Sequence, residues 1–193
     1  RFLLAFFFYS MGVQTIMMAA AGFGEKTLKL GTAKLIAIIL IIQIVAIPGA
    51  LIMSYFARKV GNIKVLIFVV LLWIAVCISA YFIYNEYQFY ALAVLVGLVM
   101  GGIQSISRST YSKLIPENTP DTASFFSFYD VTEKLAIVIG LFSFAYIEEF
   151  TGSIRASALS LSVFFFVGLL VLISILFMKT STSHRSKTQM NKA

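Results

Sequence analysis

Six apolar runs, each long enough to cross a lipid bilayer, constrain the fold of this chain more than any other feature. A helix needs about 20 mostly apolar residues to cross a hydrocarbon core roughly 30 Å thick. The 193-residue chain is 60% hydrophobic and only 12% charged, whereas about a quarter of the residues in soluble domains are charged. No run shows the strict two-residue alternation of a membrane β-barrel strand. The sequence therefore predicts an all-α polytopic membrane protein with six transmembrane helices, at roughly 2–22, 33–57, 63–84, 88–111, 124–147 and 153–178.

The six runs form one predicted transmembrane domain, residues 1–178, followed by a short polar tail. The tail, residues 179–193, is basic and rich in Ser and Thr, a composition typical of disordered segments. The chain begins at Arg1 rather than Met, and its first run lacks a signal-peptide cleavage pattern, so we expect a piece of a longer protein. A single cysteine, Cys77, and a single histidine, His184, predict neither a disulfide nor a metal site, and we expect no cofactor.

Lysine and arginine divide unequally between the two sides of the predicted bundle. Cytoplasmic loops carry an excess of these residues, so we expect the richer side, with both chain ends, to be cytoplasmic. The net charge of +7 reflects this bias, because the chain lacks the soluble basic surface with stacking aromatic residues that nucleic-acid binding requires. The richer side holds Arg1, Arg58, Lys59, Lys64, Arg108, Lys113, Lys179, Arg185, Lys187 and Lys192, and the other holds Lys26, Lys29, Lys34 and Arg155.

An internal repeat is indicated by two similar segments ninety residues apart. "MGVQTI" at 11–16 matches "GGIQSI" at 101–106, and the same offset relates the second run to the fifth and the third to the sixth. Three spans per repeat would give the two repeats opposite orientations, a plan common among secondary transporters. Chance similarity between apolar helices is the alternative.

Polar side chains lie deep within the predicted spans. Gln14 and Gln43 occupy the middle of the first two runs, while Gln104 and Arg108 share one face of the fourth. Because lipid cannot satisfy these groups, we expect them to point into the bundle. They either hold helices together or line a solute path, and the repeat-related pair Gln14 and Gln104 favours the lining.

The fifth run places three charges, Asp130, Glu133 and Lys134, where lipid or a core is expected. Between Phe125 and Ile147, twelve Leu, Ile, Val or Phe residues contribute roughly −4 to −7 kcal/mol to membrane insertion. Each charge costs about 2.5 to 3.5 kcal/mol at the membrane centre, so three charges can cancel the whole gain. This helix therefore needs a water-filled cavity or charged partners.

Two interpretations of these charges are open. Asp130 and Lys134 are four residues apart with the acid first, the favourable order for an intrahelical ion pair, so they could form a structural pair. Alternatively, they form a charged cavity wall in which Lys134 contacts a solute and Asp130 and Glu133 bind a coupling ion. Removal from water would help the Glu133 carboxylate to carry a proton.

Small and helix-breaking residues mark two further spans. Pro48 and Gly49, in "VAIPGALIM", predict a kink in the second span that is either a hinge or a packing device. "GLVMGG", at 97–102 of the fourth span, predicts close approach of a neighbouring helix.

The pattern resembles the carboxy-terminal half of a major facilitator superfamily transporter, and most closely the vacuole-effluxer branch of autophagy-related amino-acid permeases. The resemblance implies twelve helices in the whole protein, a partner half of six amino-terminal helices, and a central cavity lined by the first and fourth spans here. It also implies a functional Lys134 and, through bacterial relatives, a bacterial cell membrane. The segments that carry the resemblance are "FFFYSMGVQT" (6–15), "IPGAL" (47–51), "GGIQSISRSTYSKLIP" (101–116), "FFSFYDVTEK" (125–134) and "TGSIR" (151–155).

The chain departs from the family pattern in two places. In the cytoplasmic loop motif, which here comprises Arg58, Lys59, Gly61 and Lys64, Ser54 replaces the usual first glycine and Arg58 the usual aspartate. The charge-pair gate of that motif is therefore in doubt. Before "GVQT", Ser10 and Met11 replace the usual Asn-Asp, so any ion coupling must use other carboxylates.

These observations predict a secondary active transporter that moves a small polar solute by alternating access, with amino acids the class suggested by the resemblance. Its expected partners are the solute, membrane lipid and the amino-terminal half. The alternative is a membrane-embedded structural or interaction subunit, in which the polar groups only hold helices together. An enzyme is not expected, because no zinc motif, nucleophile–base pair or phosphate-binding loop is present.

Overall fold

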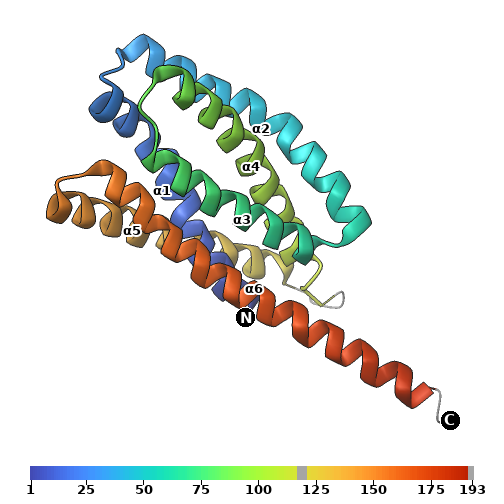
Figure 1. Ribbon diagram of the computed structural model, residues 1–193. Helices are drawn as coiled ribbons and strands as arrows, with labels where there is room; N and C mark the ends of the chain where they lie inside the picture. The colour runs from blue at the N-terminus through green and yellow to red at the C-terminus, as the bar shows by residue number, and fades with distance from the viewer. Residues whose placement is uncertain (117–120, 191–193) are drawn as a thin grey trace.

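The computed structural model describes residues 1–116 and 121–190, with side chains through residue 178. Six long helices make up almost all of this part of the chain and run back and forth along one another (Figure 1). The helices are α1 (Phe2–Leu28), α2 (Thr32–Val60), α3 (Asn62–Tyr81), α4 (Glu86–Ser112), α5 (Thr122–Thr151) and α6 (Ile154–Met190). The predicted all-α fold is confirmed.

Five of the six helices have the length and hydropathy of membrane spans, and α5 is the exception. Any eighteen-residue stretch within α5 contains at least three charged residues. The helix is nevertheless 30 residues long and packs beside α1 and α6. Its charged side chains therefore need polar or charged partners if α5 is to cross a membrane.

The arrangement of the helices supports the inverted repeat. When α1, α2 and α3 are exchanged with α4, α5 and α6, the packed pair α2–α4 becomes α1–α5, α3–α4 becomes α1–α6, and α2–α3 becomes α5–α6. Because successive helices alternate in direction, α4 runs opposite to α1 (Figure 1). One pair breaks the symmetry: α1 packs on α2, but α4 and α5 make at most marginal backbone contact.

Glycines set the close approach of α2 and α4. A Cβ at Gly101 would overlap the carbonyl oxygen of Ala46, and one at Gly49 would overlap the backbone of Leu98. The predicted packing role of the "GLVMGG" segment is thus confirmed, and Gly49 packs as well. In the other repeat, a Cβ at Gly140 of α5 would meet the backbone of α1.

The turns divide the bundle into two ends. The first, which we call the basic end, holds the chain start, the α2–α3 turn and the end of α4, while the opposite end holds the α1–α2, α3–α4 and α5–α6 turns (Figure 1). The basic end contains the segments in which the sequence has most of its Lys and Arg residues, as predicted. Gly61 forms the α2–α3 turn with a φ of +102°, a conformation that favours glycine.

The last helix differs from the prediction. The sequence predicts a span ending near 178 and a disordered tail, but the backbone of α6 is helical to Met190. Residues 179–190 contain neither Pro nor Gly, so nothing in their sequence forces the helix to stop. Residues 191–193 lie outside the described part of the chain.

Candidate solute cavity

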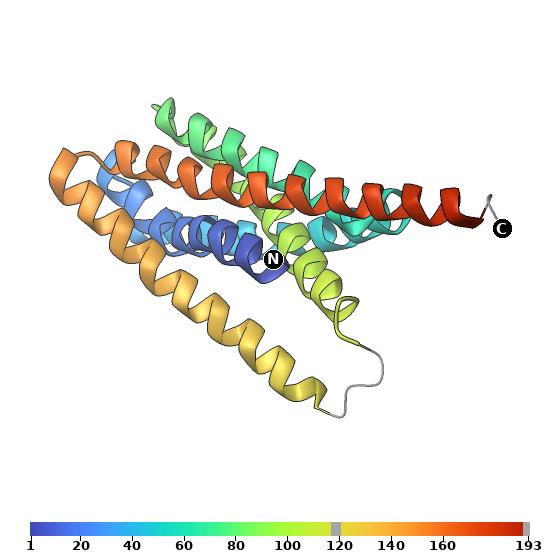
Figure 2. The ribbon, with the colours of Figure 1, turned by 90° about the horizontal axis from the view of Figure 1, so that it is seen from below.

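A polar cavity of about 680 Å³ lies between α1, α4 and α5, in the half of the bundle nearer the basic end. It occupies the place where the repeat symmetry fails, since α4 and α5 make at most marginal backbone contact. Toward its N-terminus, α5 moves away from the start of α1 (Figure 2). The polar or charged residues in its wall are Tyr9, Ser10, Gln14, Gln104, Ser105, Ser107, Arg108, Ser109, Ser112, Tyr129 and Glu133.

The cavity floor is rigid because buried side chains join α1 to α4 and α5. The hydroxyl groups of Tyr9 and Ser107 lie 2.7 Å apart and form a buried hydrogen bond between α1 and α4. The rings of Phe6 and Tyr129 stack with centroids 4.1 Å apart, which links α1 to α5. The Tyr111 ring lies 5.1 Å from that of Tyr129 and extends the cluster to the end of α4.

Glu133 is one of two carboxylates of α5 that reach toward this cavity. The side-chain amide of Gln14, on α1, donates a hydrogen bond of 2.5 Å to Glu133 Oε1. Both side chains are half-buried. The partner of Glu133 is therefore a neutral amide, which satisfies the oxygen without balancing its charge.

Asp130 has a charged partner on another helix. Arg108 Nη2, on α4, lies 2.8 Å from Asp130 Oδ1, and the guanidinium group also lies 5.8 Å from the Tyr129 ring centroid. This ion pair spans the gap between α4 and α5 at the cavity edge. The side chains of Arg108 and Asp130 are 60% and 51% exposed, so water or a solute can reach them.

The predicted intrahelical pair between Asp130 and Lys134 is wrong. Asp130 pairs with Arg108 instead, because the N-terminal part of α5 lies beside the end of α4, within ion-pair distance of the guanidinium. Lys134 is exposed, lies outside the cavity wall, and forms no ion pair with any described side chain. It follows Asp130 by one helical turn, so both residues lie on the same open stripe of α5.

The structure brings together most of the predicted site residues but not all. Gln14, Gln104, Arg108 and Glu133 all line one cavity. Gln43 is exposed on α2 and is not part of the wall. The loop-motif residues Arg58, Lys59, Gly61 and Lys64 are also absent from it.

Sequence reasoning missed the hydroxyl groups of the cavity. Ser105, Ser109 and Ser112 of α4 recur at helical spacing on the face that carries Arg108, a pattern that was available in "SISRSTYS". Tyr9 and Tyr129 carried no such signal, because aromatic residues are common throughout these spans. In the part of the chain that the structure describes, no three His, Cys, Asp or Glu side chains are placed to hold a metal ion.

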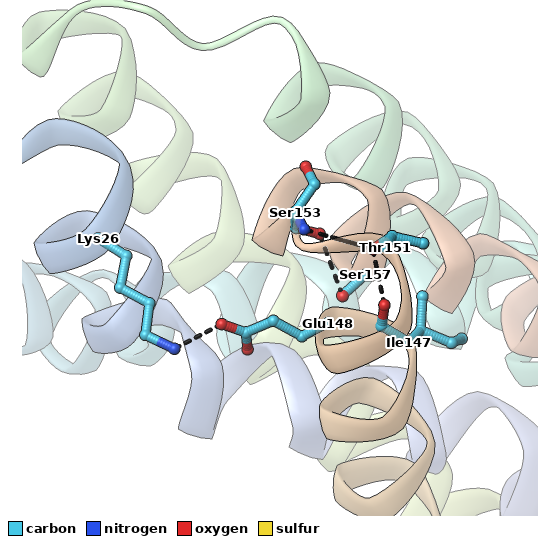
Figure 3. A network of polar contacts seen from close by, with 6 residues as sticks. All are labelled: Lys26, Ile147, Glu148, Thr151, Ser153 and Ser157. Atoms are coloured by element: carbon cyan, nitrogen blue, oxygen red, sulfur yellow. Dashed lines mark hydrogen bonds and ion pairs between the residues drawn. The ribbon is translucent and has the colours of Figure 1, made fainter.

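Ion pairs and hydrogen bonds connect the helices at the opposite end of the bundle. Lys26 of α1 pairs with Glu148 of α5, beside the α5–α6 turn (Figure 3). Lys34 Nζ of α2 lies 2.7 Å from Glu86 Oε2 of α4. Arg155 Nη2 of α6 donates a 2.7 Å hydrogen bond to the carbonyl oxygen of Ile83. These contacts hold the helices together at the end farther from the cavity.

The hydroxyl groups of the α5–α6 turn bond to its own backbone. Thr151 Oγ1 donates to the carbonyl oxygen of Ile147 at 2.6 Å, and Ser157 Oγ donates to that of Ser153 at 3.3 Å (Figure 3). Gly152 completes the turn with a φ of +64°. Glu148 therefore extends from a well-defined turn toward Lys26.

The sequence also matches a known family along nearly its whole length. The profile of the family described as "Vacuole effluxer Atg22 like" matches residues 1–188. The chain belongs to this family. The match confirms the resemblance to the vacuole-effluxer branch inferred from the sequence, and the apolar helices agree with an integral membrane protein.

Individual members of the family match over a similar extent. A Bacillus subtilis protein named "Uncharacterized MFS-type transporter YxiO" is 34% identical over 171 residues, covering 89% of this chain and 39% of that protein. Autophagy-related protein 22 of Cryptococcus neoformans is 33% identical over 187 residues, covering 89% and 32%. The Saccharomyces cerevisiae protein of the same name is 27% identical over 186 residues, covering 90% and 34%. The chain thus spans between about a third and two fifths of the length of these relatives.

Proposed function

We propose that this chain is the carboxy-terminal half of a twelve-helix secondary transporter that moves a small polar solute by alternating access. The observation that carries the proposal is the polar cavity between α1, α4 and α5, inside a bundle whose other helices are apolar. A transporter needs such a path because polar solutes cannot cross hydrocarbon. The inverted repeat, with its site at the repeat interface, is the arrangement that secondary transporters use.

In this proposal, the solute binds between the cavity wall and the amino-terminal half. Gln14 and Gln104 present amide groups from repeat-related positions, and Arg108 presents a cation. Lys134 lies on the open side of α5, where its ammonium group can face the solute or a carboxylate of the other half. Amino acids fit this arrangement, since the Arg108 cation and the Glu133 carboxylate line one cavity and can receive the two ends of a zwitterion.

Ion coupling is assigned to α5. Asp130 is held by Arg108, whereas Glu133 has only the neutral Gln14 as its hydrogen-bond partner among the described residues. Glu133 is therefore the carboxylate that can accept a proton without breaking an ion pair. Asp130 instead holds Arg108 in position through the ion pair. If a bound solute broke this pair, solute binding would be coupled to movement of α5.

In this proposal, the described conformation is the inward-facing state. The cavity lies toward the basic end, which we expect to be cytoplasmic because of its excess of Lys and Arg. At the opposite end, the ion pairs Lys26–Glu148 and Lys34–Glu86 join α1 to α5 and α2 to α4. We assign the protein to a bacterial cell membrane, with both termini cytoplasmic.

The alternative, a structural subunit without a solute path, requires the polar groups to be sealed between helices. Gln104 and Arg108 are instead exposed at the cavity, which favours transport. The test is uptake and efflux of a panel of amino acids and other small polar solutes by the full-length protein in proteoliposomes. We expect at least one solute to be moved by the wild type and not by Gln104→Leu or Lys134→Met; unchanged rates in both variants for every transported solute would overturn the site assignment.

A further inference from the structure

A second groove lies on the outside of the bundle, at the basic end, between the end of α2 and the start of α3. Its volume is about 360 Å³, and its wall is apolar except for one lysine. The wall residues are Met53, Phe56, Val60, Lys64, Val65 and Phe68. Phe56 and Phe68 are each about half exposed, so the groove presents aromatic surface outward.

This groove does not open into the solute cavity. Ser54, one residue after Met53, faces the cavity side of α2, because its hydroxyl lies 2.9 Å from that of Ser105, which is part of the cavity wall. Phe56 follows Ser54 by two residues, so it points roughly 200° away around the helix. The groove therefore lies on the membrane-facing side of α2 and α3.

The polar and apolar parts of the groove are separated by depth. Lys64 is the third residue of α3, and Phe68 lies one helical turn deeper on the same face. Val60 is the last residue of α2, and Phe56 and Met53 lie one and two turns deeper. A cation thus stands at the level of the membrane surface, directly above an apolar slot at the level of the acyl chains.

The charge around the groove is not balanced by protein. Neither α2 nor α3 contains an Asp or Glu, and Arg58, Lys59 and Lys64 form no ion pair with any described side chain. Lys59 is one turn from Tyr55 and lies over its ring at 4.4 Å. Three exposed cations around the α2–α3 turn are therefore available to a negatively charged partner from outside the described chain.

We propose that the groove binds one anionic phospholipid, with an acyl chain between Phe56 and Phe68 and the phosphate on Lys64. Basic pockets between transmembrane helices at the cytoplasmic surface are sites for acidic lipid headgroups. The apolar slot distinguishes this site from a general basic surface, since it receives the chain of the same molecule whose headgroup the lysine binds. Lys59, near the end of α2, adds to the positive electrostatic potential around the groove.

The proposal is tested with the full-length protein by native mass spectrometry in detergent. Phosphatidylglycerol and phosphatidylcholine with identical acyl chains compete at equal concentrations. We expect the wild type to retain phosphatidylglycerol preferentially. We expect Lys64→Gln to weaken that retention about fivefold, since one lysine near a membrane surface contributes about 1 kcal/mol to binding of anionic lipid.

Two controls separate this site from general charge effects. Lys29→Gln makes the same change of charge at the opposite end of the bundle and should retain the lipid as the wild type does. Phe68→Ala should weaken retention of both lipids, because it shortens the apolar slot. Melting temperatures in lipid-free detergent establish that each variant is folded.

Three results would overturn the proposal. In the first, folded Lys64→Gln retains phosphatidylglycerol as strongly as the wild type. In the second, Lys29→Gln loses as much retention as Lys64→Gln. In the third, glycerol phosphate alone displaces the lipid at equal concentration, which would make the groove a simple anion site.

Discussion

Within α5, two carboxylates near the cavity have partners of different charge. Asp130 pairs with the Arg108 guanidinium, and Glu133 accepts a hydrogen bond from the Gln14 amide. Protonation of Asp130 would remove an ion pair, whereas protonation of Glu133 would remove no ion pair with a described residue. The two residues therefore have separate expected roles, and single substitutions can distinguish them.

For Glu133, we predict that Glu133→Gln abolishes solute-driven proton movement while solute binding persists. The glutamine keeps a hydrogen-bond acceptor for Gln14 but cannot exchange a proton. The measurement is internal pH, read with a fluorescent dye in proteoliposomes as solute is added. Glu149→Gln, on an exposed carboxylate of the same helix, is the matched control and should behave as the wild type; equal proton movement in both variants would remove Glu133 from the mechanism.

For the ion pair, we predict a functional effect larger than its effect on stability. Arg108 and Asp130 are more than half exposed, and exposed pairs contribute about 0.2–1 kcal/mol. Arg108→Gln and Asp130→Asn should therefore each change the melting temperature little but slow transport severely. Their effects on transport should not add in the double variant, because both remove the same contact; additive effects would show that the two residues act separately.

Tyr9 should contribute mainly to stability. Its hydroxyl is buried and bonds to that of Ser107, and a typical hydrogen bond of this kind contributes about 0.5–1.5 kcal/mol. We predict that Tyr9→Phe lowers the melting temperature of the full-length protein. Adding Ser107→Ala to Tyr9→Phe should lower the melting temperature little further, because the hydrogen bond is already lost. A solute affinity lost in Tyr9→Phe at unchanged stability would contradict this assignment.

Among the helices, the closest contact is between α2 and α4, and it depends on glycine. Gly101 has no room for a Cβ beside the Ala46 carbonyl oxygen, whereas Gly22 of α1 has nothing near it. We predict that Gly101→Ala sharply reduces the yield of folded protein, because the two backbones must separate. Gly22→Ala should be tolerated; size-exclusion profiles of both variants, measured side by side, test the difference, and equal profiles would contradict it.

The sequence predicted the elements well but not the partner of each charge. The six apolar runs predicted the helices, and the ninety-residue offset predicted the inverted repeat. Both could be read from the sequence because span length and span direction depend only on the order of residues along the chain. Local spacing made Lys134 the partner of Asp130 in one of the two interpretations left open by the sequence. In the structure Asp130 pairs with Arg108, because the start of α5 lies beside the end of α4 (Figure 2), and contact between two helices leaves no periodic signal in the sequence.

In the whole bundle, a cavity near one end is combined with ionic contacts at the other. Lys26 joins α1 to α5 at the end opposite the cavity through Glu148 (Figure 3). Alternating access would require this contact to open when the cavity closes. We predict that Glu148→Gln shifts the full-length protein toward the outward-facing state, read as increased modification of a cysteine introduced beside Lys26; unchanged modification would show that the pair does not hold this end closed.

The central claim is that the cavity between α1, α4 and α5 binds the transported solute. The most direct measurement compares two glutamines on neighbouring helices: Gln104, in the cavity wall, and Gln43, exposed on α2. Binding of each solute to the full-length protein in detergent is read as a rise in melting temperature, since a ligand stabilises the state that binds it. We predict that one solute stabilises the wild type and Gln43→Leu but not Gln104→Leu. Stabilisation of Gln104→Leu to the same extent as the wild type would contradict the claim.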